Sequence, residues 1–274
     1  MTVRTDTSVL ITAYNYGQYL PETISSIAAQ TRLPVEVIIV NDGSTDDTAE
    51  IVAVLQREYA NNFPIRLITQ KNSGVASALN RGFQEARTSY VAHLDADDLV
   101  SPTFVEVLTS ALDRNPKAAV AYGKYRLFEG ESGQGRYYDF SPGRLVFDWC
   151  YISSANVMRR EAVMATRGWR SDLEAWEDYE FYLTLLQEGW TAVGVPEVVH
   201  FWRRHVGARN YQKLKVRLRL KRQLLLGHMP LVIRLLPVAP FWLTVSLLAR
   251  LRYRIGITRG PHFFRAQSPW ILPD

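Results

Sequence analysis

The sequence is poor in cysteine and has no apolar run long enough to cross a bilayer. Cys150 is the single cysteine among 274 residues. It can form no intrachain disulfide and no cysteine-based zinc site, and such usage suits a reducing compartment. Residues 9–11, the apolar run near the N-terminus, are too few for the core of a signal peptide. We therefore expect a cytoplasmic protein.

Acidic residues are almost absent from the last quarter of the chain. Residues 201–274 contain 15 Lys and Arg and one acid, Asp274, which gives a formal charge of +14. Residues 1–200 contain 17 Lys and Arg and 26 Asp and Glu, which gives −9. A segment this basic is expected to meet an anionic surface, either nucleic acid or lipid.

The apolar part of this basic segment favours lipid. Residues 235–249 carry no charge, but they fall short of the ~20 residues that span a bilayer, and two prolines interrupt them. Phe241 and Trp242 lie within this apolar run and not among the basic residues, which fits lipid better than stacking on bases. We expect residues 211–274 to form an extension that associates with the cytoplasmic face of an anionic membrane. Nucleic acid is not expected as a partner.

The first hundred residues alternate short apolar runs with amphipathic segments. With 47% hydrophobic and 12% aromatic residues, the chain has the composition of a globular protein. The alternation predicts strands at residues 8–13, 35–40, 65–68 and 90–94, and helices that begin at Pro21, at Thr45 or Asp46, and at Gly74. Strands and helices that alternate in this way indicate an α/β fold, with parallel strands joined by right-handed crossovers.

The later part of the chain gives a less regular pattern. It predicts a helix from Pro102, a long strand at 118–128, a hairpin or loop at 129–138, a strand at 155–158, and helices at 160–166 and 177–188. Residues 213–220 alternate basic and apolar residues with the period of a strand, but their composition favours a helix. Both structures remain open for that segment.

Polar side chains follow three of the predicted strands. Thr12 and Tyr14 end the first strand, Asp42 follows the second, and Asp95 and Asp97 follow the fourth. Ligands of open parallel sheets bind at the carboxyl ends of the strands. The sequence therefore predicts that these side chains share one binding edge.

The acidic cluster Asp95-Ala96-Asp97-Asp98 is the strongest candidate for a metal site. Carboxylates at positions i and i+2 of a tight loop can converge on one hard cation, which then binds phosphate oxygens. Mn²⁺ and Mg²⁺ both suit such a site. The alternative is a solvated loop whose acids cap the helix near Pro102. Asp42 likewise has two readings, because it can accept a hydrogen bond from a ring N–H of a base or can steady an Asx turn.

Five motifs in order resemble glycosyltransferase family 2. They are Thr12-Ala13-Tyr14-Asn15, residues 40–46 (Val-Asn-Asp-Gly-Ser-Thr-Asp), residues 72–80 from Asn72 to Asn80, Leu94-Asp95-Ala96-Asp97-Asp98, and the pair Gly168-Trp169 with Trp176-Glu177-Asp178-Tyr179. The match runs over about residues 7–205. The resemblance implies a GT-A fold, a Rossmann-like and mainly parallel sheet flanked by helices. It also implies a nucleotide-diphosphate sugar donor, a divalent metal and inversion at the anomeric carbon.

The resemblance also implies roles for individual residues. Residues 1–100 would be the donor half and residues 101–210 the acceptor half of one domain. Residues that would contact the nucleotide sugar are Thr12, Ala13, Tyr14, Asn15, Asp42, Lys71, Gly74, Asn80, Asp95, Ala96 and Arg203. Residues that would hold Mn²⁺ or Mg²⁺ are Asp97, Asp95, Asp98 and His205. The family's aspartate pair is extended here by Asp98, so either Asp97 or Asp98 could be the main ligand.

Asp178 would be the general base, with Glu177 beside it. An inverting displacement needs a carboxylate opposite the leaving group that deprotonates the acceptor hydroxyl. Without the resemblance, both acids read as residues favoured by the dipole at a helix N-terminus. The predicted enzyme moves a sugar, most simply from a UDP-sugar, to a glycan or lipid-linked acceptor.

Two other functions compete with this one. A nucleotidyltransferase also uses metal-bound diphosphate, but such enzymes begin with a glycine-rich loop, and residues 14–17 contain one glycine. A catalytically inactive, membrane-bound scaffold that binds sugar or nucleotide is the alternative outside enzymes. The presence of every acid that the transfer requires argues against it.

Overall fold

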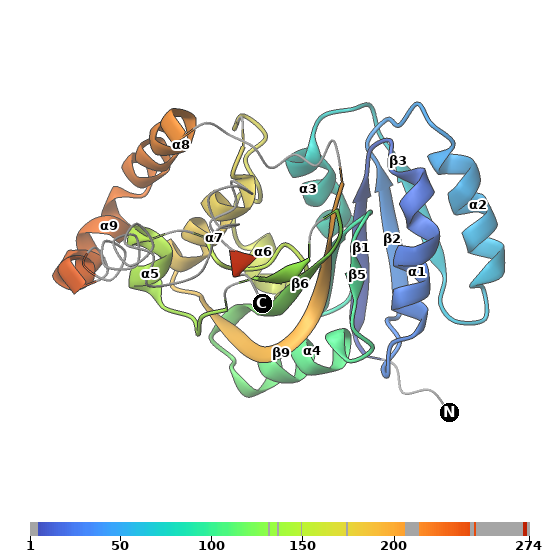
Figure 1. Ribbon diagram of the computed structural model, residues 1–274, viewed down its shortest axis with the longest axis horizontal. Helices are drawn as coiled ribbons and strands as arrows, with labels where there is room; N and C mark the ends of the chain where they lie inside the picture. The colour runs from blue at the N-terminus through green and yellow to red at the C-terminus, as the bar shows by residue number, and fades with distance from the viewer. Residues whose placement is uncertain are drawn as a thin grey trace.

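The computed structural model describes residues 5–130, 132–135, 137–148, 150–173, 175–205, 214–241, 244 and 271–272. These residues form one mixed sheet with helices on both faces (Figure 1). The strand order along the sheet is β10-β7-β6-β8-β4-β1-β2-β3, and β9 pairs with β5 and β6. The expected α/β class is confirmed.

The donor half is the parallel part of the sheet, and it follows the alternation read from the sequence. Its elements are β1 (Thr7–Ala13), η1 (Gly17–Tyr19), α1 (Leu20–Ala28), β2 (Glu36–Asn41), α2 (Thr48–Glu58), β3 (Ile65–Thr69), α3 (Val75–Glu85) and β4 (Tyr90–Asp95). β1 pairs in parallel with both β2 and β4, and β2 with β3. Six of the seven residues of β1 are buried because helices cover both of its faces, as the apolar run predicts.

Residues 99–204, most of them in the predicted acceptor half, add antiparallel pairs to this sheet. Their elements are β5 (Leu99–Val100), α4 (Phe104–Arg114), β6 (Ala118–Glu129), β7 (Gly133–Gly135), α5 (Pro142–Phe147), β8 (Asn156–Arg159), α6 (Arg160–Met164), α7 (Glu177–Gln187) and β9 (Thr191–Arg204). β10 (Ile271–Leu272), in the predicted extension, pairs antiparallel with β7. β8 lies antiparallel between β4 and β6. β6 and β7 form the hairpin that was one of two alternatives for residues 129–138. Neither β9 nor α5 is predicted from the sequence.

Two apolar layers cover the two faces of the sheet. Val9 and Ile11 of β1 pack with the layer that includes α1, α2 and α4. Leu10, between them in the chain, packs with the layer that includes α3, α6 and α7. This alternation is the side-chain period of a strand, so both layers belong to one folded unit.

The extension continues as helices against the acceptor half. Its elements are α8 (Leu214–Gly227), α9 (Met229–Leu235) and η2 (Leu236–Val238). Residues 214–220 are helical, which settles the choice left open between strand and helix. Within the described residues no single helix is long and apolar enough to cross a bilayer, although α8 and α9 pass that test as a pair bent by 89°. Most of the uncharged run 235–249 lies outside the described residues.

Candidate active site

The carboxyl ends of β1, β2 and β4 meet at one edge of the sheet. Thr12 lies opposite Asp95 in the β1–β4 register, and Ala13 lies opposite Asn41 in the β1–β2 register. Asp42 follows Asn41 directly and donates its main-chain N–H to the Ala13 carbonyl. The chain therefore brings the ends of these strands together as the sequence predicts.

Asp42 holds the loop that leads into α3. Its Oδ1 accepts hydrogen bonds from Gln70 Nε2 at 2.8 Å and from the Ser73 main-chain N–H at 2.9 Å. Its Oδ2 accepts one from the Gly74 N–H at 2.8 Å. Gly74 has φ +85°, in the left-handed region that favours glycine, and α3 begins at the next residue. Asp42 thus fixes the turn that carries Lys71, whose side chain is exposed.

Asn15 joins the first two loops of the donor half. Its main-chain N–H donates to Ser44 Oγ at 3.0 Å, and its side-chain oxygen accepts from the Thr45 N–H at 2.7 Å. Asn15 has φ +57°, a conformation that Asn tolerates better than most residues. Tyr14 next to it is 45% exposed, so its ring is available to a ligand at this edge.

Asp97 lies beside His205. The two side chains are 2.9 Å apart between Asp97 Oδ2 and His205 Nε2, although 108 residues separate them in the chain. Burial, and after it the neighbouring Asp98 and Asp95, raise the pKa of Asp97 to about 6, while the contact with His205 opposes this shift. A carboxyl crowded by like charges favours an additional positive charge nearby.

Asp98 points away from this pair and has other partners. Its Oδ2 is 2.7 Å from His200 Nε2, and its Oδ1 accepts from the Arg203 main-chain N–H at 2.9 Å. His200 Nδ1 in turn is 2.7 Å from Ser153 Oγ, and all three side chains are buried. Both oxygens of Asp98 are therefore engaged in fixing β9 to the acidic loop. Because both oxygens of Asp98 have partners, these contacts favour Asp97 over Asp98 as the main ligand of the expected metal.

Arg203, which is expected to contact the donor, has protein partners on three sides. Its guanidinium donates to the Asp97 carbonyl at 2.7 Å and pairs with Glu22 at 2.6 Å and with Glu129. The side chain is 3% exposed. Through these contacts Arg203 ties the acidic loop to α1 and to the end of β6. Its expected contact with the donor stays a prediction.

Two tyrosines that no motif singled out surround His205. The Tyr19 ring stacks on the imidazole with 5.2 Å between the ring centroids, and the Tyr16 ring meets the imidazole edge-on with 5.6 Å between the centroids. Burial and the nearby acids, Asp97 foremost among them, raise the pKa of Tyr16 to about 12. The tyrosines limit the orientations that His205 can adopt. Ala96 is held from the same side, because Thr23 Oγ1 donates to its carbonyl at 2.8 Å.

Asp178 stands on the acceptor side, in the first turn of α7. Its Oδ1 accepts a hydrogen bond from Trp169 Nε1 at 3.0 Å. Burial, and after it the charges of Glu177 and Asp95, raise the pKa of Asp178 to about 8, while the hydrogen bond from Trp169 opposes this shift. Because the charge of Asp95 contributes to the raised pKa of Asp178, the acid on the acceptor side and the cluster on the donor side are close enough to repel each other. Asp178 thus has the proton affinity that suits a general base near neutral pH.

Asn80, which is expected to contact the donor, also positions Trp169. Its Nδ2 donates to the Trp169 carbonyl at 2.7 Å, and its Oδ1 accepts from the Trp169 N–H at 2.9 Å. Gly168 has φ +73°, and a Cβ at this residue would overlap Asn80 Oδ1. This explains the Gly-Trp motif. The contacts lead from α3 through Trp169 to Asp178 and so join the two halves of the site.

The donor set suits a divalent cation that also binds a ligand. Asp97 and His205 offer one carboxylate and one imidazole, and Asp95 begins the same short loop. Among the described residues no three His, Cys, Asp or Glu side chains converge tightly enough to hold a metal by themselves. The expected set of four ligands is therefore not assembled. Two protein ligands leave coordination positions for phosphate oxygens and water, as is usual for Mg²⁺ and related cations.

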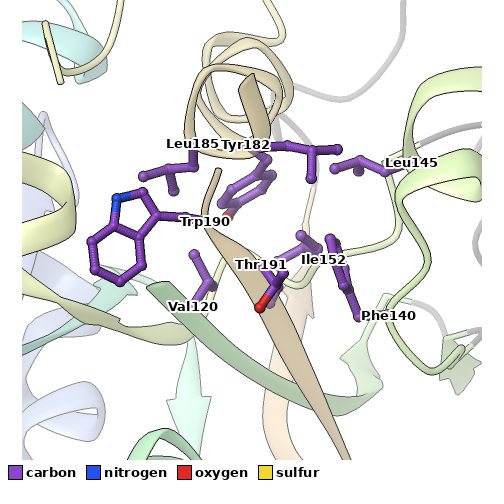
Figure 2. Close-up of a pocket in the computed structure, with 10 residues that line it drawn as sticks. Val120, Phe140, Leu145, Ile152, Tyr182, Leu185, Trp190 and Thr191 are labelled. Atoms are coloured by element: carbon purple, nitrogen blue, oxygen red, sulfur yellow. The ribbon is translucent and has the colours of Figure 1, made fainter. Parts of the chain in front are cut away.

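An apolar pocket lies behind α7. Figure 2 shows Tyr182 and Leu185 of α7 facing Val120 of β6 and Trp190 across it. Its lining contains no acid, and Tyr182 is one helical turn beyond Asp178. The pocket is part of the apolar packing between α7 and β6.

The model of glycosyl transferase family 2 matches residues 8–174, so the chain belongs to this family. Chondroitin synthase of Escherichia coli is 31% identical over 188 residues, which cover 66% of this chain and 26% of that protein. Hyaluronan synthase of Pasteurella multocida is 36% identical over 115 residues, or 42% of this chain and 12% of that protein. The chain spans between 12% and 51% of these and other curated relatives.

Solved structures confirm the expected GT-A fold. Residues 1–349 of S. aureus TarS in complex with UDP give a TM-score of 0.62 at 21% identity, over 73% of this chain and 61% of that one. The mannosyltransferase PcManGT from Pyrobaculum calidifontis, in complex with GDP-Man and Mn²⁺, gives 0.61 at 20% identity, over 93% and 76%. At these identities the likeness concerns the fold alone.

Proposed function

We propose that this glycosyltransferase moves a sugar from a nucleotide-diphosphate sugar to an acceptor hydroxyl with inversion, and that Asp178 is its general base. The observation that carries the proposal is the position of Asp178. It is a half-buried carboxyl in the first turn of α7, it accepts a hydrogen bond from Trp169, and burial together with the charges of Glu177 and Asp95 raises its pKa to about 8. A base for an inverting displacement has to stand on the opposite side of the sugar from the leaving diphosphate.

The residues around the site divide this work. Asp178 takes the proton of the acceptor hydroxyl, and Trp169 keeps its carboxylate oriented. Asp97 and His205 would hold Mn²⁺ or Mg²⁺, and such a cation stabilises the negative charge of the departing diphosphate. Asp98 and Arg203 keep the acidic loop in place. Tyr14 offers an exposed ring to the base, and the turn that Asp42 fixes offers main-chain N–H groups and Lys71 to the phosphates.

Relatives support the substrate classes. TarS has been solved with UDP and with UDP-GlcNAc, and PcManGT with GDP-Man and Mn²⁺. We propose UDP as the nucleotide, because the carboxylate of Asp42 follows β2 at the edge where a uracil N–H would need an acceptor. The proposed acceptor is a glycan or a lipid-linked glycan, in keeping with relatives named as chondroitin and hyaluronan synthases. Cytoplasmic location stays a prediction.

The substitution Asp178→Asn tests this proposal. Without a base, kcat should fall by about 10²- to 10⁴-fold, whereas the affinity for the nucleotide sugar should stay the same. Release of UDP from UDP-sugars with Mn²⁺ measures the first quantity, and calorimetric titration measures the second. Glu188→Gln, an exposed acid at the other end of α7, is the matched control and should behave as wild type.

Other outcomes separate the competing functions. Near-normal turnover by Asp178→Asn would show that another group is the base. Binding of nucleotide sugars without turnover, across a panel of donors and acceptors, would favour the inactive scaffold. Release of pyrophosphate from a nucleoside triphosphate and a sugar phosphate would favour the nucleotidyltransferase.

A further inference from the structure

Large exposed apolar side chains gather on one short stretch of the extension. The described residues expose ten of them, and six lie between residues 226 and 241. We call these six the apolar ridge: Leu226, Met229, Ile233, Leu236, Val238 and Phe241. Their exposed fractions run from 41% to 61%. The other four, such as Val54 of α2, are scattered singly over the molecule, which is ordinary for a protein surface.

The ridge belongs to helices that are fixed to the core. Leu224 and Leu231, on the opposite side of the same helices, are 2% and 1% exposed. The buried His228 lies 3.0 Å from Gln187 Oε1 and 3.3 Å from Glu180 Oε1, both on α7. Arg234 donates to the Leu186 carbonyl at 2.9 Å. The outward direction of the ridge is therefore set by packing.

The net charge of the chain segment that contains the ridge indicates which kind of partner the ridge binds. Residues 201–274 carry +14, and the exposed Arg222 lies on the helix that begins the ridge. A second copy docked through this face would bring two such charges together. A nucleic acid would satisfy the charge but would leave six apolar side chains against phosphate and water. An anionic lipid surface suits both properties, because it offers headgroup charge and an apolar interior.

We propose that the apolar ridge inserts into the interface of an anionic membrane, with the basic residues of the extension against the headgroups. In this arrangement residues 219–227 and 229–241, which meet at an angle of 89°, both lie along the surface, and neither segment crosses the bilayer. α8 and α9 occupy the end of the molecule farthest from α2 and β3, so the donor half extends away from the lipid (Figure 1).

The anchors of the extension have a consequence for the acceptor. α9 and the end of α8 hold α7 at Glu180, Leu186 and Gln187, and the same helix carries Asp178 in its first turn. Docking through the ridge would therefore hold the acceptor half near the headgroups. Resting on the proposed function, this predicts a lipid-linked acceptor whose sugar end reaches Asp178 while its lipid stays in the bilayer.

Vesicle flotation of the full chain tests the ridge. Wild type should float with vesicles of phosphatidylcholine and phosphatidylglycerol, and far less with phosphatidylcholine alone. The double variant Ile233→Asp/Leu236→Asp should bind anionic vesicles roughly 100-fold more weakly, since each exposed apolar side chain that enters lipid contributes about tenfold. Val54→Asp adds one such charge at an exposed apolar residue of α2 and should bind as wild type. Ile233→Gln/Leu236→Gln serves if the Asp variant fails to fold, which its thermal melt will show.

Three results would overturn the inference. They are unchanged flotation of the double variant, equal binding of wild type to both kinds of vesicle, and a wild-type dimer in light scattering that the double variant dissociates. Flotation needs no turnover, so it stays informative if the glycosyltransferase proposal fails. Conversely, UDP release with a water-soluble acceptor should be the same in wild type and double variant, whatever the vesicles show.

Discussion

The donor and acceptor sides of the site hold their carboxylates in opposite ways. On the donor side, Asp42 accepts hydrogen bonds from three groups and Asp98 is held by His200 and the Arg203 main chain. On the acceptor side, Asp178 accepts a hydrogen bond from Trp169, and burial together with the charges of Glu177 and Asp95 raises its pKa to about 8. The polar contacts on the donor side form a polar frame that sets the geometry of the site, whereas desolvation on the acceptor side raises proton affinity.

Asp98→Ala should give the largest effect, because it breaks a buried pair inside the polar frame. Leaving His200 without its carboxylate is expected to lower the free energy of unfolding by about 3–5 kcal/mol. Urea unfolding measures it. Asp172→Ala, which removes an exposed acid paired with Arg170, should leave the free energy of unfolding almost unchanged. Equal stability of the two variants would mean that Asp98 is no part of a frame.

Asp97→Asn should weaken metal-dependent donor binding without a loss of stability, the opposite of what is expected for the neighbouring Asp98. Binding of a UDP-sugar in the presence of Mn²⁺ should weaken by at least ~10–100-fold, the loss seen when only a supporting residue of a metal site is removed. Calorimetry with and without Mn²⁺ separates the metal-dependent part. The metal-free variant should melt slightly higher than wild type at pH 7. The pKa of Asp97 is raised to about 6, so its ionised form disfavours folding above that pH. A lower melting temperature would place Asp97 in the frame with Asp98.

Trp169→Phe should act on proton affinity on the acceptor side. The indole N–H stabilises the ionised carboxylate, so its loss raises the pKa of Asp178. A hydrogen bond to a charged group is worth about 1.5–3 kcal/mol, which moves the acid limb of kcat/KM to higher pH by about one to two pH units. Activity should recover at high pH, which a packing defect alone would not allow. Trp190→Phe, which also removes an indole from apolar packing, should leave the limb in place.

Asp42→Asn should give the smallest effect. The amide can still accept hydrogen bonds at one oxygen, but it cannot accept from the Gly74 N–H, at a cost of about 1 kcal/mol. Hydrogen exchange at Ser73 and Gly74 should speed up several-fold, and donor affinity should fall by a similar factor. Faster exchange without any change in donor affinity would show that the turn does not contact the donor.

The donor half could be predicted well because its signals are local. Apolar runs such as residues 35–40 mark strands, and the turn residues after them mark the sheet edge. Asp178 was predicted from the family's motif, and its environment in the structure gives a physical reason for that role. Helix propensity correctly outweighed the period-two pattern at residues 214–220, where packing against the core favours a helix.

The rest depends on contacts between residues far apart in the chain. β9 has no clear alternation, and Gly194 and Pro196 interrupt it, so only pairing with β6 reveals it as a strand. Arg203 was expected at the donor, but its partners Glu22 and Glu129 lie 181 and 74 residues away. Stacking of Tyr19 on His205 likewise follows from the fold, and no spacing in the sequence predicts it.

β9 also restricts how the length of this chain can change. One strand of 14 residues leads from the end of α7 to Arg203, and His205 follows directly. The number of residues in this strand therefore sets the distance between α7, which carries the proposed base, and the proposed metal ligand. Strand side chains alternate between faces, so one inserted residue would turn His205 away from Asp97. Evolution and engineering are therefore expected to vary length at the tip of the β6–β7 hairpin, where insertions leave that count untouched.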